Sequence, residues 1–158
     1  MRPVVVTREV PQPPEVVYDR IDVLADHEAF TDHLLIDWQA SGPRSGVGAR
    51  ASMRIRKPGR PDRLEMVVAA AERPRRTVEE SVSAGGRRRT RGTYELAPNG
   101  AGGTRISFEF AWLEAPLSER ILAPLTRLVT RRANAESLRR LAERLSADPE
   151  KPRGMEQS

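Results

Sequence analysis

Short segments with the two-residue alternation of a β-strand fill the middle of the chain, and they constrain its fold more than any other feature. They occupy residues 35–40, 49–56, 64–72, 77–83, 89–96 and 104–113, and Gly- and Pro-rich turns separate most of them. In residues 49–56 every second side chain is apolar, from Ala49 to Ile55, which is typical of a half-buried strand. Successive strands joined by short turns predict an antiparallel meander.

A further strand and two short helices are predicted before this meander. Residues 4–10 are rich in Val and Thr and predict a strand. Pro14 suits the first turn of a helix that extends to about Leu24, because its missing N–H would have no partner there. Asp26 is the expected N-cap of a second short helix that ends near His33.

A long amphipathic helix is predicted at residues 117–145, where apolar side chains recur with a period near 3.6. Pro124 is expected to kink this helix or to split off a short first piece. We expect the helix to contribute more to the core than any other element. Its apolar stripe, expected to face Phe108, Phe110 or Trp112, consists of Leu125, Leu128, Leu138 and Leu141.

A twisted sheet of this length curls, and its concave face must be covered by another element. The final helix is the predicted element long enough to do so. The expected fold class is therefore α+β, with a curved seven-stranded antiparallel sheet wrapped around the long C-terminal helix. One domain is expected over residues 1–146, followed by a disordered tail at residues 147–158, which contains two prolines, a glycine and mixed charges.

The residue composition and the motifs of the chain exclude several classes of function. The chain lacks cysteine, which excludes disulfides, zinc–thiolate sites and thiol catalysis. It has no apolar run of membrane-spanning length and no recognisable signal peptide, so a cytoplasmic protein is expected. No nucleophile elbow, phosphate-binding loop or metal-ligand spacing is present, and neither a cofactor nor a metal is expected.

Four parts of the sequence carry a family resemblance: PPEVVYDRIDVLADHEAF, SGPRSGVGA, GTYELAPNGAGGTRISFEFAW and the proline-interrupted final helix. In these parts the chain resembles the START-like (SRPBCC) superfamily, in particular its bacterial polyketide cyclase/dehydrase and lipid-binding branch. The resemblance covers roughly residues 3–145. It implies the helix-grip fold, and a cavity between sheet and helix that in relatives holds lipids, polyketides, hormones or quinones.

Three functions are compatible with this resemblance. The first is the binding of a small hydrophobic ligand in that cavity, which needs little more than an apolar wall. The second is an enzyme of the polyketide aromatase/cyclase or dehydratase type, which needs convergent polar groups inside the cavity. The third is a partner-binding domain like the coenzyme-Q-binding and ribosome-associated relatives, which needs a filled core and a conspicuous outer patch. The absence of a visible acid–base set favours the first and third functions.

The candidate cavity-lining residues are apolar or aromatic side chains on the predicted strands and on the final helix, together with one carboxylate. They are Trp38, Met53, Ile55, Met66, Val68, Glu80, Tyr94, Phe108, Phe110, Trp112, Leu125 and Leu128. The aromatic members are expected mainly to fill the core. Relatives with cyclase activity often polarise a substrate carbonyl with such residues, so a catalytic part for Trp38, Tyr94 and Trp112 stays open.

Glu80 is the unusual candidate, because strict alternation places it on the same strand face as Val78 and Val82. If that face is inward, Glu80 needs an arginine partner, a ligand hydroxyl or a general-base role, whereas a bulge would turn it outward. We favour the ion pair or the bulge. His27 and His33 are interpreted as surface or capping residues of the second helix, because six residues separate them.

Two predicted turns carry a cluster of basic side chains, and because alternate turns of a meander lie at the same end of the sheet, the two should be neighbours. The residues of this basic rim are Arg54, Arg56, Lys57, Arg60, Arg87 and Arg88. They either keep the turns soluble or attract an anionic partner, for which an acidic carrier protein and an anionic membrane surface are the candidates. Nucleic acid is not expected, because aromatic residues are few.

Overall fold

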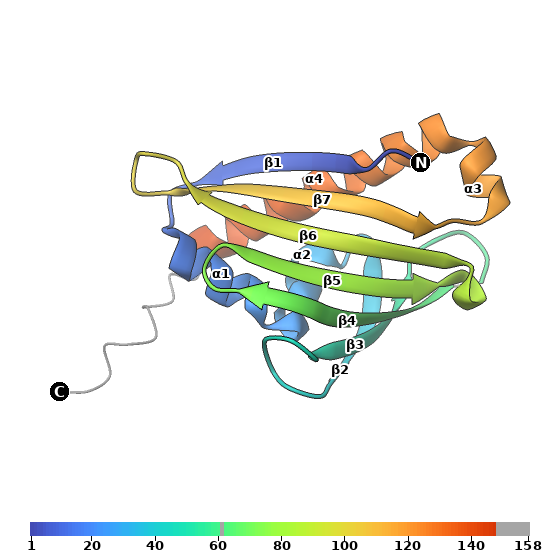
Figure 1. The fold of residues 1–158 in the computed structure, drawn as a ribbon, viewed down its shortest axis with the longest axis horizontal. Helices are drawn as coiled ribbons and strands as arrows, with labels where there is room; N and C mark the ends of the chain where they lie inside the picture. Colours follow the sequence, from blue (N-terminus) through green and yellow to red (C-terminus); the bar gives the residue numbers. More distant parts are fainter. Residues whose placement is uncertain (61, 148–158) are drawn as a thin grey trace.

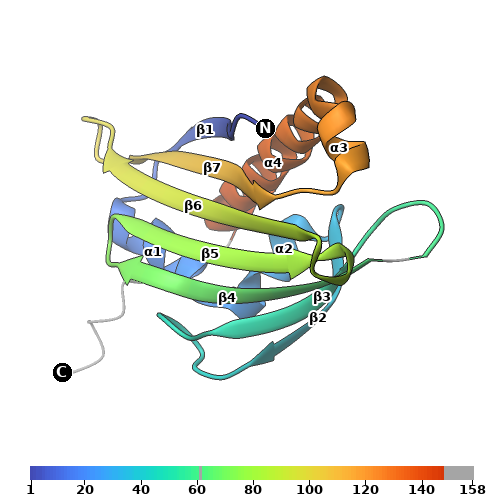
Figure 2. The same cartoon turned by 45° about the vertical axis from the view of Figure 1, so that its right-hand side comes forward.

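One curved antiparallel sheet dominates the computed structural model, which describes residues 1–60 and 62–147 (Figure 1). Its strands are β1 (Val4–Val10), β2 (Leu35–Ser41), β3 (Arg50–Ile55), β4 (Asp62–Glu72), β5 (Arg76–Ser83), β6 (Arg88–Pro98) and β7 (Thr104–Glu114). The strand order β1-β7-β6-β5-β4-β3-β2 confirms the predicted meander from β2 to β7, with β1 added at the β7 edge. Figure 2 shows the curl of the sheet, with α4 across its concave side.

The apolar alternation of β7 directs its large side chains to the concave face. Ile106 pairs with Leu96 of β6, and Phe108 pairs with Tyr94. All four side chains are buried in the main core, and the rings of Tyr94 and Phe108 lie 4.4 Å apart between centroids. Aromatic pairs at this separation add to the stability that burial alone provides.

Three short helical segments follow β1, where two had been predicted. They are α1 (Pro14–Asp22), the 3-10 turn η1 (Leu24–His27) and α2 (Glu28–Thr31). Pro14 occupies the first turn of α1, as predicted. The prediction of an Asp26 N-cap is wrong, because the turn begins earlier, with Val23 at its N-cap. The His27 imidazole Nε2 lies 2.6 Å from the Ile21 carbonyl oxygen, which stabilises this tight turn.

The final helix is split near Pro124, as predicted, into α3 (Leu117–Ile121) and α4 (Ala123–Ala147). In the second half of α4, Leu138, Leu141 and Leu145 are buried in the main core. The prediction that Leu125 and Leu128 are also buried is wrong, since they are 56% and 44% exposed. The first half of α4 lies over a pocket and not over packed side chains, so these leucines have no core to enter.

A second cluster of buried side chains lies under β2, β3 and β4. Met53 and Val68 belong to it, together with Leu24 of η1. Both residues were predicted to line a cavity, and both are instead packed among neighbouring side chains. The predicted tail begins where α4 ends, at Ala147, and residues 148–158 lie outside the described residues.

Candidate functional site

A pocket of about 470 Å³ lies between the concave face of the sheet, the η1–α2 segment and the first half of α4. It exists because α4 packs on the core through its second half only, which leaves unfilled space under residues 122–137. Apolar side chains form most of its wall. Those predicted from the sequence that do line it are Trp38, Ile55, Met66, Tyr94, Phe108, Phe110, Trp112 and Leu125.

The remaining candidates lie elsewhere. Met53 and Val68 are core residues, and Leu128 lies on a face of α4 that does not border the pocket. Glu80 points away from the pocket and forms an ion pair with Arg91 of β6, at 2.9 Å between Oε1 and Nη2. The ion pair had been expected for an inward Glu80, but it forms on the outer face of the sheet.

Glu79, and not Glu80, is the carboxylate that faces inward on β5. It pairs with Gly92 of β6 and with Val68 of β4, and its side chain borders the pocket. The inward face of β5 carries Ser81 as well, so a polar stripe crosses an otherwise apolar wall. The sequence analysis missed Glu79 because it considered only the strand face that carries Val78, Glu80 and Val82 as a possible inward face, and it left the orientation of that face open.

His27 lies opposite Glu79 and is also buried, which corrects its interpretation as a surface or capping residue. Its Nδ1 is 3.8 Å from Glu79 Oε2, and its ring lies 6.1 Å from the ring of Tyr94. Because Nε2 contacts the Ile21 carbonyl, Nδ1 is the ring nitrogen directed at the carboxyl group. The pocket therefore contains an imidazole, a carboxyl and a phenol from three separate elements.

Burial governs the electrostatics of this group. It raises the pKa of the Glu79 carboxyl, and the nearby His27 ring partly opposes that rise. Burial also raises the pKa of Tyr94 well above its ordinary value, and the negative charge of Glu79 adds to the effect. Both side chains are thus shifted towards their protonated, uncharged forms.

Two further polar atoms in the pocket wall are buried without a hydrogen-bond partner among the residues that the structure describes. They are Nδ2 of Asn134, on α4, and Nε1 of Trp38, on β2. Both atoms are N–H donors, and leaving a buried donor unpaired costs free energy. Asn134 was not predicted as part of the site, whereas Trp38 was predicted mainly to fill the core, with a catalytic part left open.

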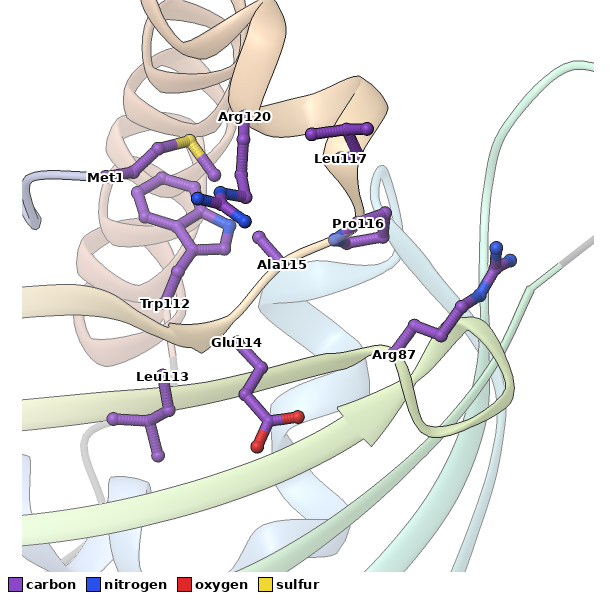
Figure 3. Close-up of a pocket in the computed structure, with 9 residues that line it drawn as sticks. All are labelled: Met1, Arg87, Trp112, Leu113, Glu114, Ala115, Pro116, Leu117 and Arg120. Carbon is purple, nitrogen blue, oxygen red and sulfur yellow. The ribbon is translucent and has the colours of Figure 1, made fainter.

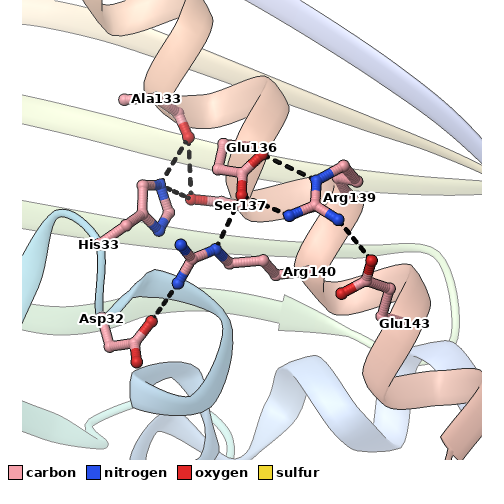
Figure 4. Close-up of polar contacts among 8 residues, drawn as sticks. All are labelled: Asp32, His33, Ala133, Glu136, Ser137, Arg139, Arg140 and Glu143. Carbon is pink, nitrogen blue, oxygen red and sulfur yellow. Dashed lines mark hydrogen bonds and ion pairs between the residues drawn. The ribbon is translucent and has the colours of Figure 1, made fainter.

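Polar contacts connect the turn after α2, at residues 32 and 33, to α4 beside the pocket (Figure 4). The His33 Nε2 lies 3.0 Å from the Ala133 carbonyl oxygen, which also accepts from the Ser137 hydroxyl. Arg140 forms an ion pair with Asp32. His33 is therefore partly buried against α4, which corrects its interpretation as a surface or capping residue of its own helix.

At the other end of the pocket, Arg88 joins three elements. Its guanidinium donates to Asp62 of β4 and Glu119 of α3, as well as to the Ser83 hydroxyl. Burial alone would raise the pKa of Asp62, but the hydrogen bonds from Arg88 and from the Ala84 amide outweigh it and hold that pKa below its usual value. Arg88 is thus a partly buried structural connection and not a free charge of the rim.

The two basic turns are neighbours, since the Ala84 amide of one donates to Asp62 at the edge of the other. Arg56 and Lys57 border the pocket together with Arg88. Arg54 pairs instead with Asp37, and Arg60 is exposed beyond the pocket. Arg73 lies at the opposite end of the sheet, where it contacts Asp19 of α1.

Arg87 borders a separate hollow on the outer side of the β7–α3 junction (Figure 3). In that view the Trp112 indole lies between Met1 and Arg120, while Leu117 projects from α3. Trp112 borders both this hollow and the main pocket. Within the described part of the chain, no helix is long and apolar enough to cross a membrane, and no three His, Asp or Glu side chains are grouped as metal ligands.

Comparison with known proteins gives a family match over nearly the whole chain. A family model described as "Polyketide cyclase / dehydrase and lipid transport" matches residues 1–146. No curated protein matches the chain.

Solved structures with the same fold include TTHA0849 from Thermus thermophilus, with a TM-score of 0.72, 23% identity, and coverage of 92% of this chain and 98% of the other. The KanY protein (ms6282) has a TM-score of 0.73 and 18% identity, with coverage of 92% and 97%. DynU16, described as a putative protein in the dynemicin biosynthetic locus, has a TM-score of 0.62 and 19% identity, with coverage of 91% and 47%. At these identities the likeness establishes the fold alone.

Proposed function

Because this chain belongs to the polyketide cyclase / dehydrase and lipid-transport family, we propose that its central pocket binds a small hydrophobic ligand, of the size of a lipid chain, a polyketide or a quinone-like molecule. The observation that carries this proposal is the pocket of about 470 Å³ with a largely apolar wall. Ligand sites in proteins are commonly apolar hollows of several hundred Å³ with a few polar groups placed in the wall. A partner-binding domain with a filled core is disfavoured by the same pocket.

The test is saturable binding of the neutral fluorescent probe N-phenyl-1-naphthylamine. Val129 lines the pocket and is 59% exposed, whereas its neighbour Leu128 is 44% exposed and does not line it. We expect Val129→Trp to weaken binding of the probe at least about tenfold by obstructing the entrance, and Leu128→Trp to leave it unchanged. Absence of saturable binding, or equal losses in both variants, would contradict the proposed site.

A second candidate is a cyclase- or dehydratase-type enzyme, favoured by the enclosed His27–Glu79 pair. An imidazole and a carboxyl in a largely apolar pocket are groups that can move protons to and from a carbonyl substrate. Turnover of a poly-β-carbonyl compound that Glu79→Gln abolishes, while the compound still binds, would support this function. Binding without turnover would leave the carrier function.

For the partner, we propose an anionic lipid surface. The observation is an apolar face on α3 and the start of α4, with basic side chains next to it. Leu117 and Ile121 are 66% and 70% exposed, and Arg87 and Arg120 are exposed beside the hollow that Leu117 borders. Apolar side chains flanked by arginines suit a membrane interface better than they suit an acidic protein, which needs the charges alone.

A further inference from the structure

The contacts that the Glu79 carboxyl makes within the described part of the fold are weak. Its ion-pair contact is with His27 Nδ1 at 3.8 Å, whereas N–H···O hydrogen bonds extend to about 3.2 Å. Within residues 1–60 and 62–147, no hydrogen bond reaches this carboxyl. A buried carboxyl with neither a hydrogen bond nor a close ion pair destabilises the fold, so a purely structural role does not explain it.

The strand opposite Glu79 is shaped to leave its side chain in contact with the pocket. Gly92 is its partner across β6, and a Cβ atom built on Gly92 would lie 2.9 Å from the Phe108 ring and 3.4 Å from Glu79 Cγ. Glycine therefore lets the Phe108 ring lie beside Glu79 without displacing it. The carboxyl is accordingly next to an aromatic wall and borders the pocket.

Donors complement this acceptor in the same pocket. Asn134 is 6% exposed, and neither its Nδ2 nor Trp38 Nε1 has a hydrogen-bond partner in the described part of the chain. A hydroxyl group can donate to a carboxyl and accept from an N–H, and it carries no charge that would have to be desolvated. It can also donate to Glu79 whether that carboxyl is ionised or protonated, since either form retains an acceptor oxygen.

We propose that this pocket is specific for ligands with an uncharged hydroxyl group, which donates its hydrogen to the Glu79 carboxyl beside His27 and accepts from Asn134 or Trp38. The inference rests on the proposed binding function and names the chemistry of the ligand. Glu79 is a specificity-determining residue in this proposal. A ligand without a hydroxyl leaves both the carboxyl and the buried donors unpaired, which lowers its affinity.

The experiment compares three neutral compounds of one shape at neutral pH: naphthalene, 2-methoxynaphthalene and 2-naphthol. Each is used to displace N-phenyl-1-naphthylamine from the wild-type chain. We expect 2-naphthol to bind about tenfold more tightly than the other two, because it alone has an O–H to donate. Equal or tighter binding of 2-methoxynaphthalene would overturn the proposal.

Variants at the consecutive positions 79 and 80 test which residue causes the preference for 2-naphthol. Glu79→Leu should lower the affinity for 2-naphthol to that for naphthalene, while the affinity for naphthalene itself stays unchanged or increases. Glu79→Gln should keep part of the preference for 2-naphthol over naphthalene. Glu80→Gln is the matched control, because Glu80 points outward to Arg91, and it should keep the wild-type preference. Far-ultraviolet circular dichroism and melting temperature establish that each variant is folded.

The outcomes separate the two proposals. If all three compounds displace the probe with one affinity, the pocket binds ligands but Glu79 does not select them, and this inference fails alone. If the probe and all three compounds fail to bind, the proposed function fails as well. An undiminished 2-naphthol preference in folded Glu79→Leu would assign the selectivity to another group and overturn the inference.

Discussion

Glu79 and Glu80 are consecutive residues of one strand with opposite environments. Glu79 faces the pocket with its pKa raised by burial, whereas Glu80 lies on the outer face with an arginine partner. The difference follows from the pleat of β5, in which adjacent side chains point to opposite faces. Val78 and Val82 share the outer face with Glu80, so the more polar face of this strand is the inward one.

The raised pKa of Glu79 predicts a pH-dependent stability. The unfolded carboxyl has a pKa of about 4.3, so between that value and the higher folded pKa the folded state binds more protons. The free energy of unfolding that Glu79 contributes is therefore fully present below about pH 4 and is lost as pH rises through the folded pKa. His27 and Tyr94 are the titratable groups beside it.

Glu79→Gln removes this titration. We expect its melting temperature to increase relative to that of the wild type as pH is raised from about 4 to about 8, and the two to approach each other at the acidic end. Glu80→Gln is the control for the change in net charge. A parallel trend in both variants would show that Glu79 is not the group responsible.

At the scale of elements, α4 is divided into two functional halves. Its second half packs on the sheet and on α1 through Leu138, Leu141 and Leu145. Its first half borders the pocket and leaves Leu125 and Val129 exposed. The amphipathic period extends along the whole helix, but the sheet offers packed side chains to only one part of it. The same helix thus packs in the core through one half and borders the pocket through the other.

This division predicts unequal costs for two similar substitutions. Leu138→Ala should lower the free energy of unfolding by about 2–5 kcal/mol, because it leaves a cavity in the main core. Leu128→Ala should change it by no more than about 0.5 kcal/mol, since this side chain is largely exposed. Chemical denaturation of both variants measures the difference, and equal costs would refute the division of α4.

At the scale of the whole molecule, the two basic turns and the pocket lie at the same end of the sheet. The chain carries a formal charge of +5, and the two basic turns meet beside the pocket and the α3 face. Arg88, however, is held by Asp62 and Glu119, so it contributes little free charge to a partner. The exposed members, including Arg60 and Arg87, are the ones available to an anionic surface.

The proposed lipid surface is tested by flotation with vesicles that contain phosphatidylserine. Reversing Arg60 and Arg87 together to Glu should reduce binding severalfold, and salt should weaken the wild-type binding, because screening acts over about 8 Å at physiological ionic strength. Ile121→Gln should also reduce binding by removing an apolar contact. Melting temperatures are expected to be nearly unchanged.

Reversal of Arg75 and Arg105 is the matched control, because both are exposed and border a hollow at the other end of the sheet. If both double reversals reduce vesicle binding equally, net charge alone is responsible. If the chain bound an acidic carrier protein but not vesicles, and Ile121→Gln had no effect on that binding, the basic rim would be a site for a protein partner.

The periodic patterns of the sequence were sufficient for the architecture. Alternation on β7 predicted the inward Ile106 and Phe108, and the positions of Pro14 and Pro124 predicted where helices begin. These are local properties, because the pleat, the helical turn and the missing proline N–H act within a few residues. The aromatic pocket residues followed from the same alternation combined with the family resemblance.

The tertiary structure alone decided which groups meet in the pocket. The two-residue alternation of a strand shows that it has two faces but not which of them is inward. For β5, the inward face was determined by its pairing with β4 and β6. His27 reaches Glu79 only because a tight turn after α1 places it over the sheet, far from β5 in sequence. Likewise, the burial of Leu138 and the exposure of Leu125 reflect where the curved sheet approaches α4, which depends on the packing of the whole chain and on no local pattern.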